Sequence, residues 1–285
     1  MTQKSCLVTG SCGFVGKALV RALQNSGHPV TGADLREGCD LTRWENVKTL
    51  PKADTIIHLA ARSFVPDSFQ DPRGYYTSNT QSTLRVLELA RLWKARLIFA
   101  SSYVYGPPRY LPIDEKHPLN GPNPYAQSKI VGESLCEAYT RHFGISTIAL
   151  RVFNVYGTGQ NPQFLIPSIL EQVRQGRVIL ADPEPRRDYV HIDDVVSAYL
   201  QALERNPGGF EAFNIGSGES HSVRDIVDLF IQYCRRSVSV EFSGKKRKAE
   251  IAETVADCRK AQQLLGWSPR IKFSDGIKHL AQPLK

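Results

Sequence analysis

A glycine-rich turn near the start of the chain is the feature that most narrows its possible folds. Residues 5–9 have a strand pattern, residues 14–26 a helical one, and Gly10, Gly13 and Gly16 lie at three-residue spacing around the junction. Glycines let the backbone bend sharply and approach a pyrophosphate closely. The N-terminus of the helix adds free N–H groups and the positive end of a dipole. The turn therefore predicts a dinucleotide site in a strand–turn–helix unit.

The rest of the chain repeats this alternation. Strands are predicted at residues 29–33, 55–60, 96–100 and 146–151, and helices at residues 81–93 and 125–143. This order favours an α/β fold, a Rossmann-type doubly wound parallel sheet with helices on both faces. After Gly157 prolines, glycines and charges increase, which indicates a smaller C-terminal substrate-binding lobe. We expect a Rossmann domain at residues 1–155, to which part of 188–213 returns, and mainly the second lobe at 156–285.

Composition is that of a soluble globular protein, with 41% hydrophobic and 22% charged residues. No apolar run approaches the ~20 residues that span a bilayer, and the first residues lack a signal-peptide pattern. We therefore expect a cytoplasmic protein without a membrane partner. Six scattered cysteines without a CxxC pair indicate reduced thiols and no metal site.

The formal net charge of +8 leaves several kinds of partner open. Nucleic-acid binding is one, but the positive charge is dispersed, and the single dense run is KKRK at residues 245–248. A solvated basic surface is the more ordinary explanation. Cationic groups that serve a small polyanionic ligand agree better with the glycine-rich turn, so we expect no nucleic-acid partner.

Asp34 directly follows the second predicted strand, 18 residues beyond Gly16. A carboxylate at this place can accept both hydroxyls of the adenosine ribose of NAD, and it repels the 2′-phosphate of NADP. Arg36 partly offsets that repulsion. The alternative role of Asp34 is that of a turn or helix-cap residue. The glycine-rich turn favours contact with the cofactor, which we expect to be NAD.

Tyr125 and Lys129 lie four residues apart on a predicted helix, so their side chains share one face. A free phenol has a pKa of about 10 and is a poor base at neutral pH. A neighbouring ammonium lowers that pKa, so the phenol can take a proton from a hydroxyl while hydride leaves for a nicotinamide. Ser101, at the end of a predicted strand, can hydrogen-bond the reacting oxygen. Taken singly, these residues also fit an exposed helix pair and a polar strand end.

Together the motifs resemble the extended short-chain dehydrogenase/reductase superfamily, and within it the NAD-dependent epimerase/dehydratase family (UDP-glucose 4-epimerase-like). The resemblance covers nearly the whole chain. It rests on TGSCGFVG (9–16), HLAA (58–61), SSYVYG (101–106), NPYAQSK (123–129), RVFNVYG (151–157), RRDYVHIDDV (186–195), FNIGSG (213–218) and LLGW (264–267). These ordered matches are specific for the family and much less so for the substrate.

The resemblance implies a role for each of a set of positions. The cofactor would contact Gly10, Gly13, Phe14, Val15, Gly16, Asp34, Asp40, Leu41, Leu59, Ala60, Ala61, Asn79, Tyr125 and Lys129. The catalytic triad would be Ser101, Tyr125 and Lys129, and Asn79 would support the active-site helix. A nucleotide-diphosphate sugar would contact Ser101, Ser102, Tyr103, Tyr125, Asn154, Arg187 and Arg247. The two arginines would grip its diphosphate.

One departure from the family pattern bears on the reaction. The family's 4,6-dehydratases carry Asp-Glu after the catalytic hydroxyl residue, whereas this chain has Ser102 and Tyr103. Dehydration of that type needs those carboxylates and is not expected. An epimerase acting at carbon 4 and a 4-keto-6-deoxyhexose-nucleotide reductase both remain. The short span from Asp34 to Asp40 is similar to such reductases.

We expect the epimerase, because an NAD-preferring site suits an enzyme that recycles its cofactor, whereas biosynthetic reductases more often use NADPH. A catalytically silent NAD-binding protein is the non-enzyme alternative. The presence of Ser101, Tyr125 and Lys129 together argues against it. The motifs suit UDP, GDP, dTDP and CDP sugars alike. Apolar positions on the helices predicted at 81–93 and 125–143 further suggest a homodimer.

Overall fold

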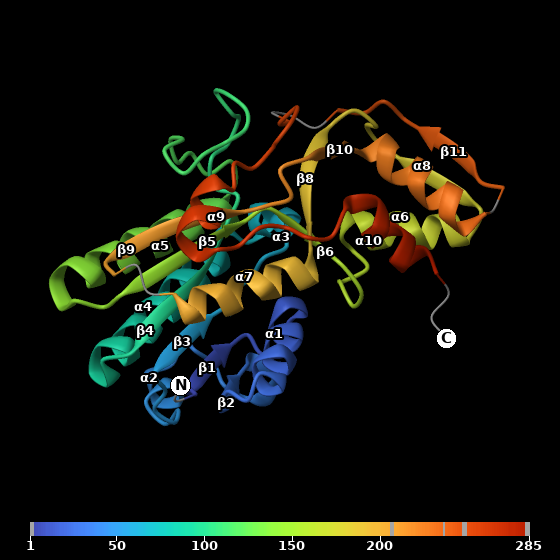
Figure 1. Ribbon diagram of the computed structural model, residues 1–285. Helices are drawn as coiled ribbons and strands as arrows, with labels where there is room; N and C mark the ends of the chain where they lie inside the picture. The colour runs from blue at the N-terminus through green and yellow to red at the C-terminus, as the bar shows by residue number, and fades with distance from the viewer. Residues whose placement is uncertain (1–2, 206–207, 236, 247–249, 283–285) are drawn as a thin grey trace.

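A six-stranded parallel sheet forms the centre of the larger of two lobes in the computed structural model (Figure 1), which describes residues 3–205, 208–235, 237–246 and 250–282. Its order is β2-β1-β3-β4-β5-β9. The strands are β1 (Cys6–Thr9), β2 (Val30–Ala33), β3 (Thr55–His58), β4 (Arg96–Ser102), β5 (Thr147–Val152) and β9 (Phe210–Ile215). The predicted doubly wound α/β fold is confirmed.

Helices cover both faces of this sheet because its strands are apolar on both sides. One face carries α1 (Phe14–Asn25) and α7 (Ile192–Glu204), whose Leu19 and Tyr199 pack on Ile98 and Ile148. The other face carries α4 (Pro72–Trp93) and α5 (Pro124–Phe143). The helix α5 approaches β4 so closely that a Cβ on Gly132 would lie 2.5 Å from the ring of Phe99. The segment 188–213 thus contains α7 and the first part of β9, both in the larger lobe, while its first residues belong to β8 of the smaller lobe.

The helix α4 begins nine residues before the predicted start at residue 81. Its first turns are mostly polar, so the apolar periodicity that predicted the helix is absent there. Asp71 caps this end, since its side chain accepts a hydrogen bond from the backbone N–H of Gly74 at 2.9 Å. Pro72 at the first helical position needs no hydrogen-bond partner. Capping and tertiary packing therefore extend the helix beyond its amphipathic part.

Short elements connect β2 to β3 and β3 to α4. They are η1 (Leu35–Glu37), α2 (Trp44–Val47) and α3 (Val65–Gln70). The strand β2 is the edge of the sheet, and β1 lies between β2 and β3. The chain therefore crosses from one side of β1 to the other at this point. Such a switch point places a crevice at the carboxyl ends of β1 and β3, where the glycine-rich turn begins.

The smaller lobe has its own core, built from helices and two small sheets. The helices are α6 (Leu165–Arg174), α8 (Val223–Cys234) and α10 (Phe273–Ala281), while α9 (Arg259–Leu265) packs on the larger lobe. The strands are β6 (Asn154–Tyr156), β8 (Arg186–His191) and β10 (Ser220–Ser222) in one sheet, and β7 (Arg177–Leu180) and β11 (Ser239–Phe242) in the other. The strand β6 directly follows β5 and carries the chain from one lobe to the other.

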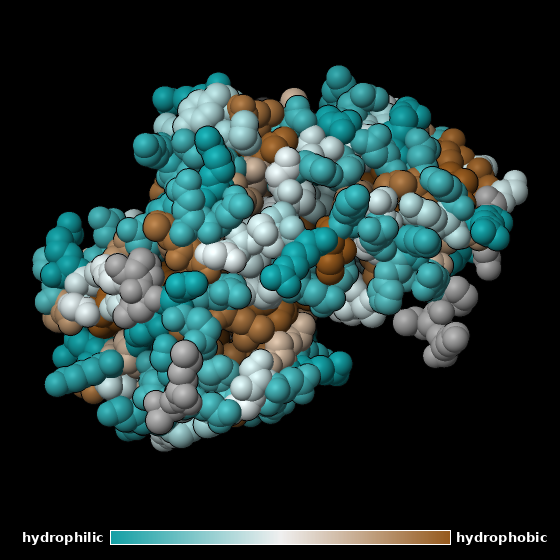
Figure 2. All heavy atoms as spheres, viewed as in Figure 1, coloured by the Kyte–Doolittle hydropathy of each residue, from teal (hydrophilic) through white to brown (hydrophobic). Residues whose placement is uncertain are grey.

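The visible surface is mainly hydrophilic, with apolar residues gathered in small groups, one of them over the small lobe near α8 and β11 (Figure 2). None of the helices in the described ranges has the length and hydropathy needed to cross a membrane.

Candidate active site

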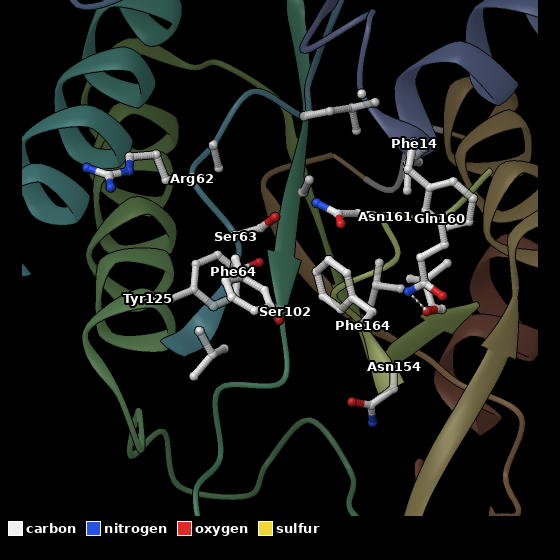
Figure 3. Close-up of a pocket in the computed structure, with 18 of the residues that line it drawn as sticks. Phe14, Arg62, Ser63, Phe64, Ser102, Tyr125, Asn154, Gln160, Asn161 and Phe164 are labelled. Carbon is white, nitrogen blue, oxygen red and sulfur yellow. Dashed lines mark hydrogen bonds between the residues drawn. The ribbon is translucent and has the colours of Figure 1, made fainter. Parts of the chain in front are cut away.

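A cavity of about 990 Å³ follows the carboxyl edge of the sheet and continues between the lobes. Its walls run from the glycine-rich turn after β1, past the ends of β3 and β4, to α6 and β8. Figure 3 shows its middle part, with Tyr125 and Ser102 on one side and Phe14 and Gln160 on the other. This is where folds of this type bind ligands.

The glycine-rich turn forms one end of the cavity, and its glycines are required by close contacts. Gly10 has a φ of +71°, and a Cβ there would lie 2.8 Å from the backbone nitrogen of Ala60. A Cβ on Gly16 would lie 2.1 Å from the carbonyl oxygen of Gly10. The cavity is lined here by Gly10, Gly13, Phe14, Val15 and Gly16. The start of α1 thus presents N–H groups in a cradle that fits a pyrophosphate.

Asp34 lies at the end of β2 and lines the cavity, as a residue that contacts the ribose must. It is also a cap residue, the alternative role predicted for it. One carboxylate oxygen accepts from the N–H of Cys12 at 3.0 Å and the other from the N–H of Arg36 at 2.9 Å. The guanidinium of Arg36 donates to the carbonyl of Cys12 at 2.9 Å. A carboxylate and a guanidinium therefore both stand beside the turn.

The remaining expected cofactor residues divide into two groups. Those that line the cavity are Asp40, Leu41, Leu59, Ala60 and Ala61. Asn79 is buried and lies behind the wall. Its side chain accepts from the N–H of Arg62 at 2.9 Å and donates to the hydroxyl of Ser128 at 2.9 Å. It thus joins the segment after β3 to α5, which agrees with the expected support of the active-site helix rather than with a contact to the cofactor.

Tyr125 and Lys129 lie in the first turns of α5, which Asn123 caps through the N–H of Ala126 at 2.8 Å. The ammonium of Lys129 is 6.0 Å from the centroid of the Tyr125 ring. It donates to the carbonyl of Ala100 at 2.8 Å, at the end of β4. The spacing of four residues thus brings both side chains to the carboxyl edge of the sheet.

The protonation properties of this pair differ from the simplest expectation. Burial lowers the pKa of Lys129 to about 8. Burial also raises the pKa of Tyr125, and a hydrogen bond with the side chain of Ser102 opposes this rise. The phenol in the protein without its ligands is therefore a weaker acid than free tyrosine, because desolvation outweighs the hydrogen bond with Ser102.

The two serines at the end of β4 point to opposite sides, because strand side chains alternate. The hydroxyl of Ser101 donates to the carboxylate of Glu133 and is only 5% exposed. The hydroxyl of Ser102 lies against the phenol of Tyr125 (Figure 3). The expected triad named Ser101, which lines the cavity as Ser102 does, but the hydroxyl beside the phenol is that of Ser102. The strand continues to Ser102, two residues beyond its predicted end, and this extension decides which serine faces Tyr125.

A buried ion pair behind the triad was not predicted. Glu133 follows Lys129 by one turn of α5, and its carboxylate is 2.6 Å from the guanidinium of Arg151 on β5. Arg151 also donates to the hydroxyl of Tyr105 at 3.0 Å. The four-residue spacing between Lys129 and Glu133 was the available signal, since it continues the face that points at β4.

The half of the cavity between the lobes contains Asn154 and Arg187, as expected. The amide of Asn154 donates to the carbonyl of Asp188 at 3.0 Å. The guanidinium of Arg187 pairs with Glu250 and donates to the carbonyl of Ile251 at 2.6 Å. Arg187 thus lies in the cavity wall with one acidic partner already in place.

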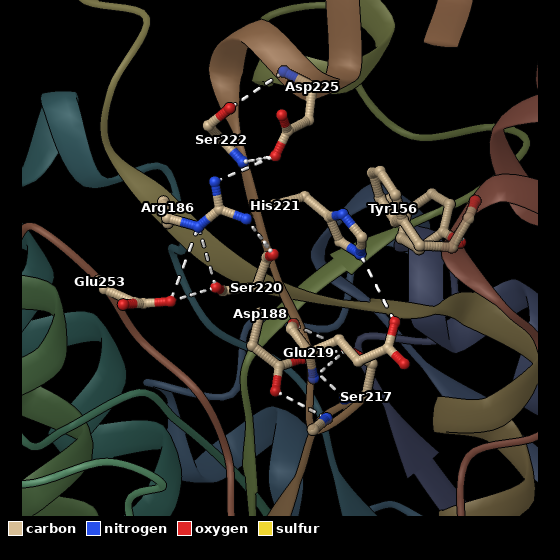
Figure 4. A network of polar contacts seen from close by, with 12 residues as sticks. Tyr156, Arg186, Asp188, Ser217, Glu219, Ser220, His221, Ser222, Asp225 and Glu253 are labelled. Atoms are coloured by element: carbon tan, nitrogen blue, oxygen red, sulfur yellow. Dashed lines mark hydrogen bonds and ion pairs between the residues drawn. The ribbon is translucent and has the colours of Figure 1, made fainter.

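The strand that carries Arg187 is anchored by the polar network in Figure 4. Asp188 is fully buried and accepts from the N–H groups of Ser217 at 2.6 Å and Gly218 at 2.9 Å. Arg186 pairs with Asp225 at 3.2 Å, on the first turn of α8. The motifs RRDYVHIDDV and FNIGSG therefore include residues that hold β8 in place.

Two further expectations concern Tyr103 and Arg247. Tyr103 is not among the described residues that line the cavity. Its hydroxyl donates to the carbonyl of Gly106, its ring packs edge-on against Phe153 at 5.3 Å, and burial raises its pKa to about 12. The structure gives no support for contact between Tyr103 and the substrate. Arg247 lies outside the described residues.

Several residues of the cavity were not predicted. Phe64, after β3, and Phe164, before α6, meet edge to face across the cavity with ring centroids 5.5 Å apart. Gln160 and Asn161 come from the loop after β6. These loops have no periodicity from which their fold could be predicted. Within the described ranges, no group of His, Cys, Asp and Glu has the arrangement of a metal site, and all six cysteines are unpaired thiols.

The chain is similar to known proteins in both sequence and structure. Residues 6–216 match the model of the NAD dependent epimerase/dehydratase family. A putative UDP-glucose 4-epimerase of Methanocaldococcus jannaschii is 33% identical over 98% of both chains. A GDP-6-deoxy-D-mannose reductase of Pseudomonas aeruginosa is 31% identical over 98% of this chain and 96% of its own. The crystal structure of a Thermotoga maritima UDP-glucose 4-epimerase with UDP-glucose superposes with a TM-score of 0.90, at 28% identity over 97% of each chain. The chain therefore belongs to the NAD-dependent epimerase/dehydratase family.

Proposed function

We propose that this chain is an NAD-dependent nucleotide-sugar epimerase that acts by transient oxidation at carbon 4 of the hexose. The observation that carries the proposal is the contact of Tyr125 with Ser102, one turn from the buried ammonium of Lys129. This group lies where the part of the cavity beside the glycine-rich turn meets the part between the lobes. It is the place at which a nicotinamide and a sugar can meet.

The proposed cofactor fits the residues of the larger lobe. The pyrophosphate would lie on the turn of Gly10, Gly13 and Gly16, whose backbone is packed too closely to accept a Cβ at Gly10 or Gly16. The adenosine would lie toward Asp34, beside Arg36. We assign this half, residues 1–155 with part of 188–213, to NAD and mainly residues 156–285 to the nucleotide sugar.

The reaction needs proton transfer at one oxygen. NAD, when bound, would supply the acceptor for a hydride from carbon 4 of the sugar and, once reduced, the donor that gives the hydride back. Tyr125 accepts the proton of the 4-hydroxyl as the hydride leaves, and Ser102 donates a hydrogen bond to the same oxygen. Lys129 holds positive charge beside the phenol as the phenolate forms. After the keto sugar has turned, Tyr125 returns the proton as hydride reaches the opposite face of carbon 4, so substrate and product differ only in configuration.

The substrate is proposed to be a nucleotide-diphosphate sugar. Arg187 in the cavity wall offers a guanidinium to the diphosphate. Asn154 lines the cavity together with Tyr125 and Arg187, and the sugar would sit among these three residues. The chain has no carboxylate at positions 102 and 103, which is against dehydration and favours a reaction that ends at carbon 4.

A 4-keto-6-deoxyhexose-nucleotide reductase is the second candidate. The similarity to the Pseudomonas reductase and the guanidinium of Arg36 beside Asp34 favour it.

We further propose that the protein is cytoplasmic and forms a homodimer. Leu84 and Leu92 on α4 and Phe143 on α5 are exposed and would pack across the two-fold axis.

One set of assays separates these functions. The purified protein is denatured, and any released dinucleotide is identified. Turnover is then measured on UDP-, GDP- and dTDP-hexoses, and on a 4-keto sugar with NADH and NADPH. The epimerase predicts bound NAD and interconversion of the 4-epimers without added reductant. Turnover only with NADPH and a 4-keto sugar would replace it by the reductase, and no turnover in any assay would favour an NAD-binding protein without catalysis.

A further inference from the structure

The side-chain amide of Gln160 has one satisfied and one unsatisfied end. Its nitrogen donates to the backbone carbonyl of Val155 at 2.8 Å. Because a carbonyl can only accept, this bond identifies the other end of the amide as the oxygen Oε1. That oxygen is buried and has no hydrogen-bond partner among the described residues. A buried acceptor without a donor costs free energy, so it is an informative exception.

Gln160 lies in the wall of the cavity, where the cofactor half meets the reaction centre. Figure 3 shows it beside Phe14 and across the cavity from Tyr125. Phe14 is the first residue of α1, directly after the glycine-rich turn. A Cβ on Gly157 would lie 3.5 Å from the ring of Phe14, so the loop after β6 packs against the start of α1.

The unsatisfied oxygen can accept a hydrogen bond from a ligand that fills this part of the cavity. A dinucleotide whose pyrophosphate lies on the turn, and whose reactive ring reaches Tyr125, places its nicotinamide in this region. Among the polar groups of that ring, the carboxamide carries N–H donors. Its NH₂ group therefore complements an acceptor held in place by Val155.

We propose that Gln160 is a cofactor-binding residue whose Oε1 accepts a hydrogen bond from the carboxamide NH₂ of the nicotinamide. The bond fixes the rotation of the ring between Phe14 and Tyr125. The bond from Gln160 to Val155 holds the amide in its orientation before the cofactor arrives, so little side-chain entropy is lost on binding. This inference rests on the proposed use of NAD.

The test is calorimetric titration with three ligands and does not require turnover. NAD carries the carboxamide, 3-acetylpyridine adenine dinucleotide carries a methyl ketone in its place, and ADP-ribose lacks the ring. The wild-type protein should bind NAD about tenfold more tightly than the acetylpyridine analogue, the worth of one hydrogen bond. Gln160→Leu should bind the two dinucleotides with affinities that differ less than threefold, and ADP-ribose as the wild type does.

Gln163→Leu is the matched control, because Gln163 is in the same loop but exposed and outside the cavity wall. It should keep the tenfold preference of the wild type. An equal loss of affinity for all three ligands in Gln160→Leu would assign this residue to the fold and overturn the inference. A wild type that binds NAD without discriminating against the analogue would overturn it too, while leaving the proposed function intact. A wild type that binds none of the ligands would overturn both.

Discussion

Glu133 and Arg151 form a buried ion pair, with nitrogen and oxygen 2.6 Å apart, behind the wall that carries Tyr125 and Lys129. Their side chains are only 4% and 6% exposed. The carboxylate of Glu133 also accepts a hydrogen bond from the hydroxyl of Ser101. The pair thus joins α5, β4 and β5 below the reaction centre without lining the cavity itself.

Arg151→Met should lower the free energy of unfolding by about 3–5 kcal/mol, because it leaves the carboxylate of Glu133 buried without its cation. Urea unfolding followed by circular dichroism measures this. Arg91→Met is the matched control. It removes the exposed partner of Glu88, whose ion pair is 2.9 Å long, and should cost less than about 1 kcal/mol. An equal loss in the free energy of unfolding for the two variants would show that burial does not strengthen the contribution of the Glu133–Arg151 pair.

Substitution of the two serines should affect different properties, kcat for Ser102 and stability for Ser101. Ser102→Ala should reduce kcat by about 10- to 100-fold, since its hydroxyl lies on Tyr125, and leave stability within about 1 kcal/mol. Ser101→Ala should keep kcat within a few fold and lower stability by about 1–3 kcal/mol, because Glu133 loses a donor. Steady-state kinetics and urea unfolding check both. The reverse pattern would restore Ser101 to the triad.

Tyr125→Phe is the reference for these variants. Loss of positioned acid–base catalysis should lower turnover by about 100- to 10,000-fold while NAD binding stays within a few fold. Because Tyr125 and Ser102 act on one proton transfer, the double variant should be little slower than Tyr125→Phe alone. Retention of more than a tenth of wild-type turnover in Tyr125→Phe would mean that the phenol is not the acid–base group.

The sequence allowed prediction of those parts of the site that repeat a local pattern. The glycine spacing around Gly10 and the four-residue step from Tyr125 to Lys129 are such patterns, and both lie in the cavity wall. The choice between Ser101 and Ser102 depends on how far β4 continues, which tertiary packing decides. A one-residue shift in a strand reverses the side to which a side chain points.

Other features had no local signal. The start of α4 at Pro72 is polar and relies on a cap, so its apolar pattern begins a few turns later. Phe164 and Gln160 come from a loop, and only the packing of the two lobes brings them into the cavity. The spacing of Asp34 in the sequence cannot distinguish a capping role from a contact with the ribose, because both roles need a carboxylate at the end of β2.

The wild-type protein should bind NAD at least tenfold more tightly than NADP, because the carboxylate of Asp34 repels a 2′-phosphate. Arg36→Ala should widen this preference, since its guanidinium donates to Cys12 beside the same carboxylate. Calorimetric titration with both dinucleotides measures the ratio. Arg21→Ala, on the exposed side of α1, is the control and should leave the ratio unchanged. Tighter binding of NADP by the wild type would show that Arg36 dominates the ribose pocket.

Light scattering should give twice the mass of the 31.8 kDa chain at micromolar concentration. Leu92→Glu should shift the species toward the monomer, because Leu92 on α4 is 55% exposed and would lie in the dimer interface. Leu264→Glu introduces the same charge at a leucine of α9 that is 48% exposed and should leave the dimer intact. A wild type that scatters as a single chain would rule out the dimer.

The buried ammonium of Lys129 should make the free energy of unfolding depend on pH, and a comparison of the wild type with Lys129→Met should reveal this dependence. Its pKa falls from 10.5 to about 8 in the folded protein, so between these values the unfolded chain binds more protons. The free energy of unfolding therefore rises with pH through this window, and the burial cost is fully present below pH 8. Lys129→Met lacks this contribution. Its stability relative to the wild type should fall by up to about 3 kcal/mol as pH increases from 7.5 to 10.5.

Urea unfolding of both proteins at pH 7.5, 9 and 10 measures this difference, in which groups that titrate identically in the two proteins cancel. Lys17→Met, on the exposed side of α1, is the control and should give a difference that does not change with pH. The same Lys129→Met protein should lose turnover and bind NAD more weakly, because the ammonium serves both the phenol and the cofactor. A difference between Lys129→Met and wild type that stays constant from pH 7.5 to 10 would mean that the ammonium is solvated in the folded protein. Its charge would then be too weak to favour the phenolate of Tyr125 in the way the proposed mechanism requires.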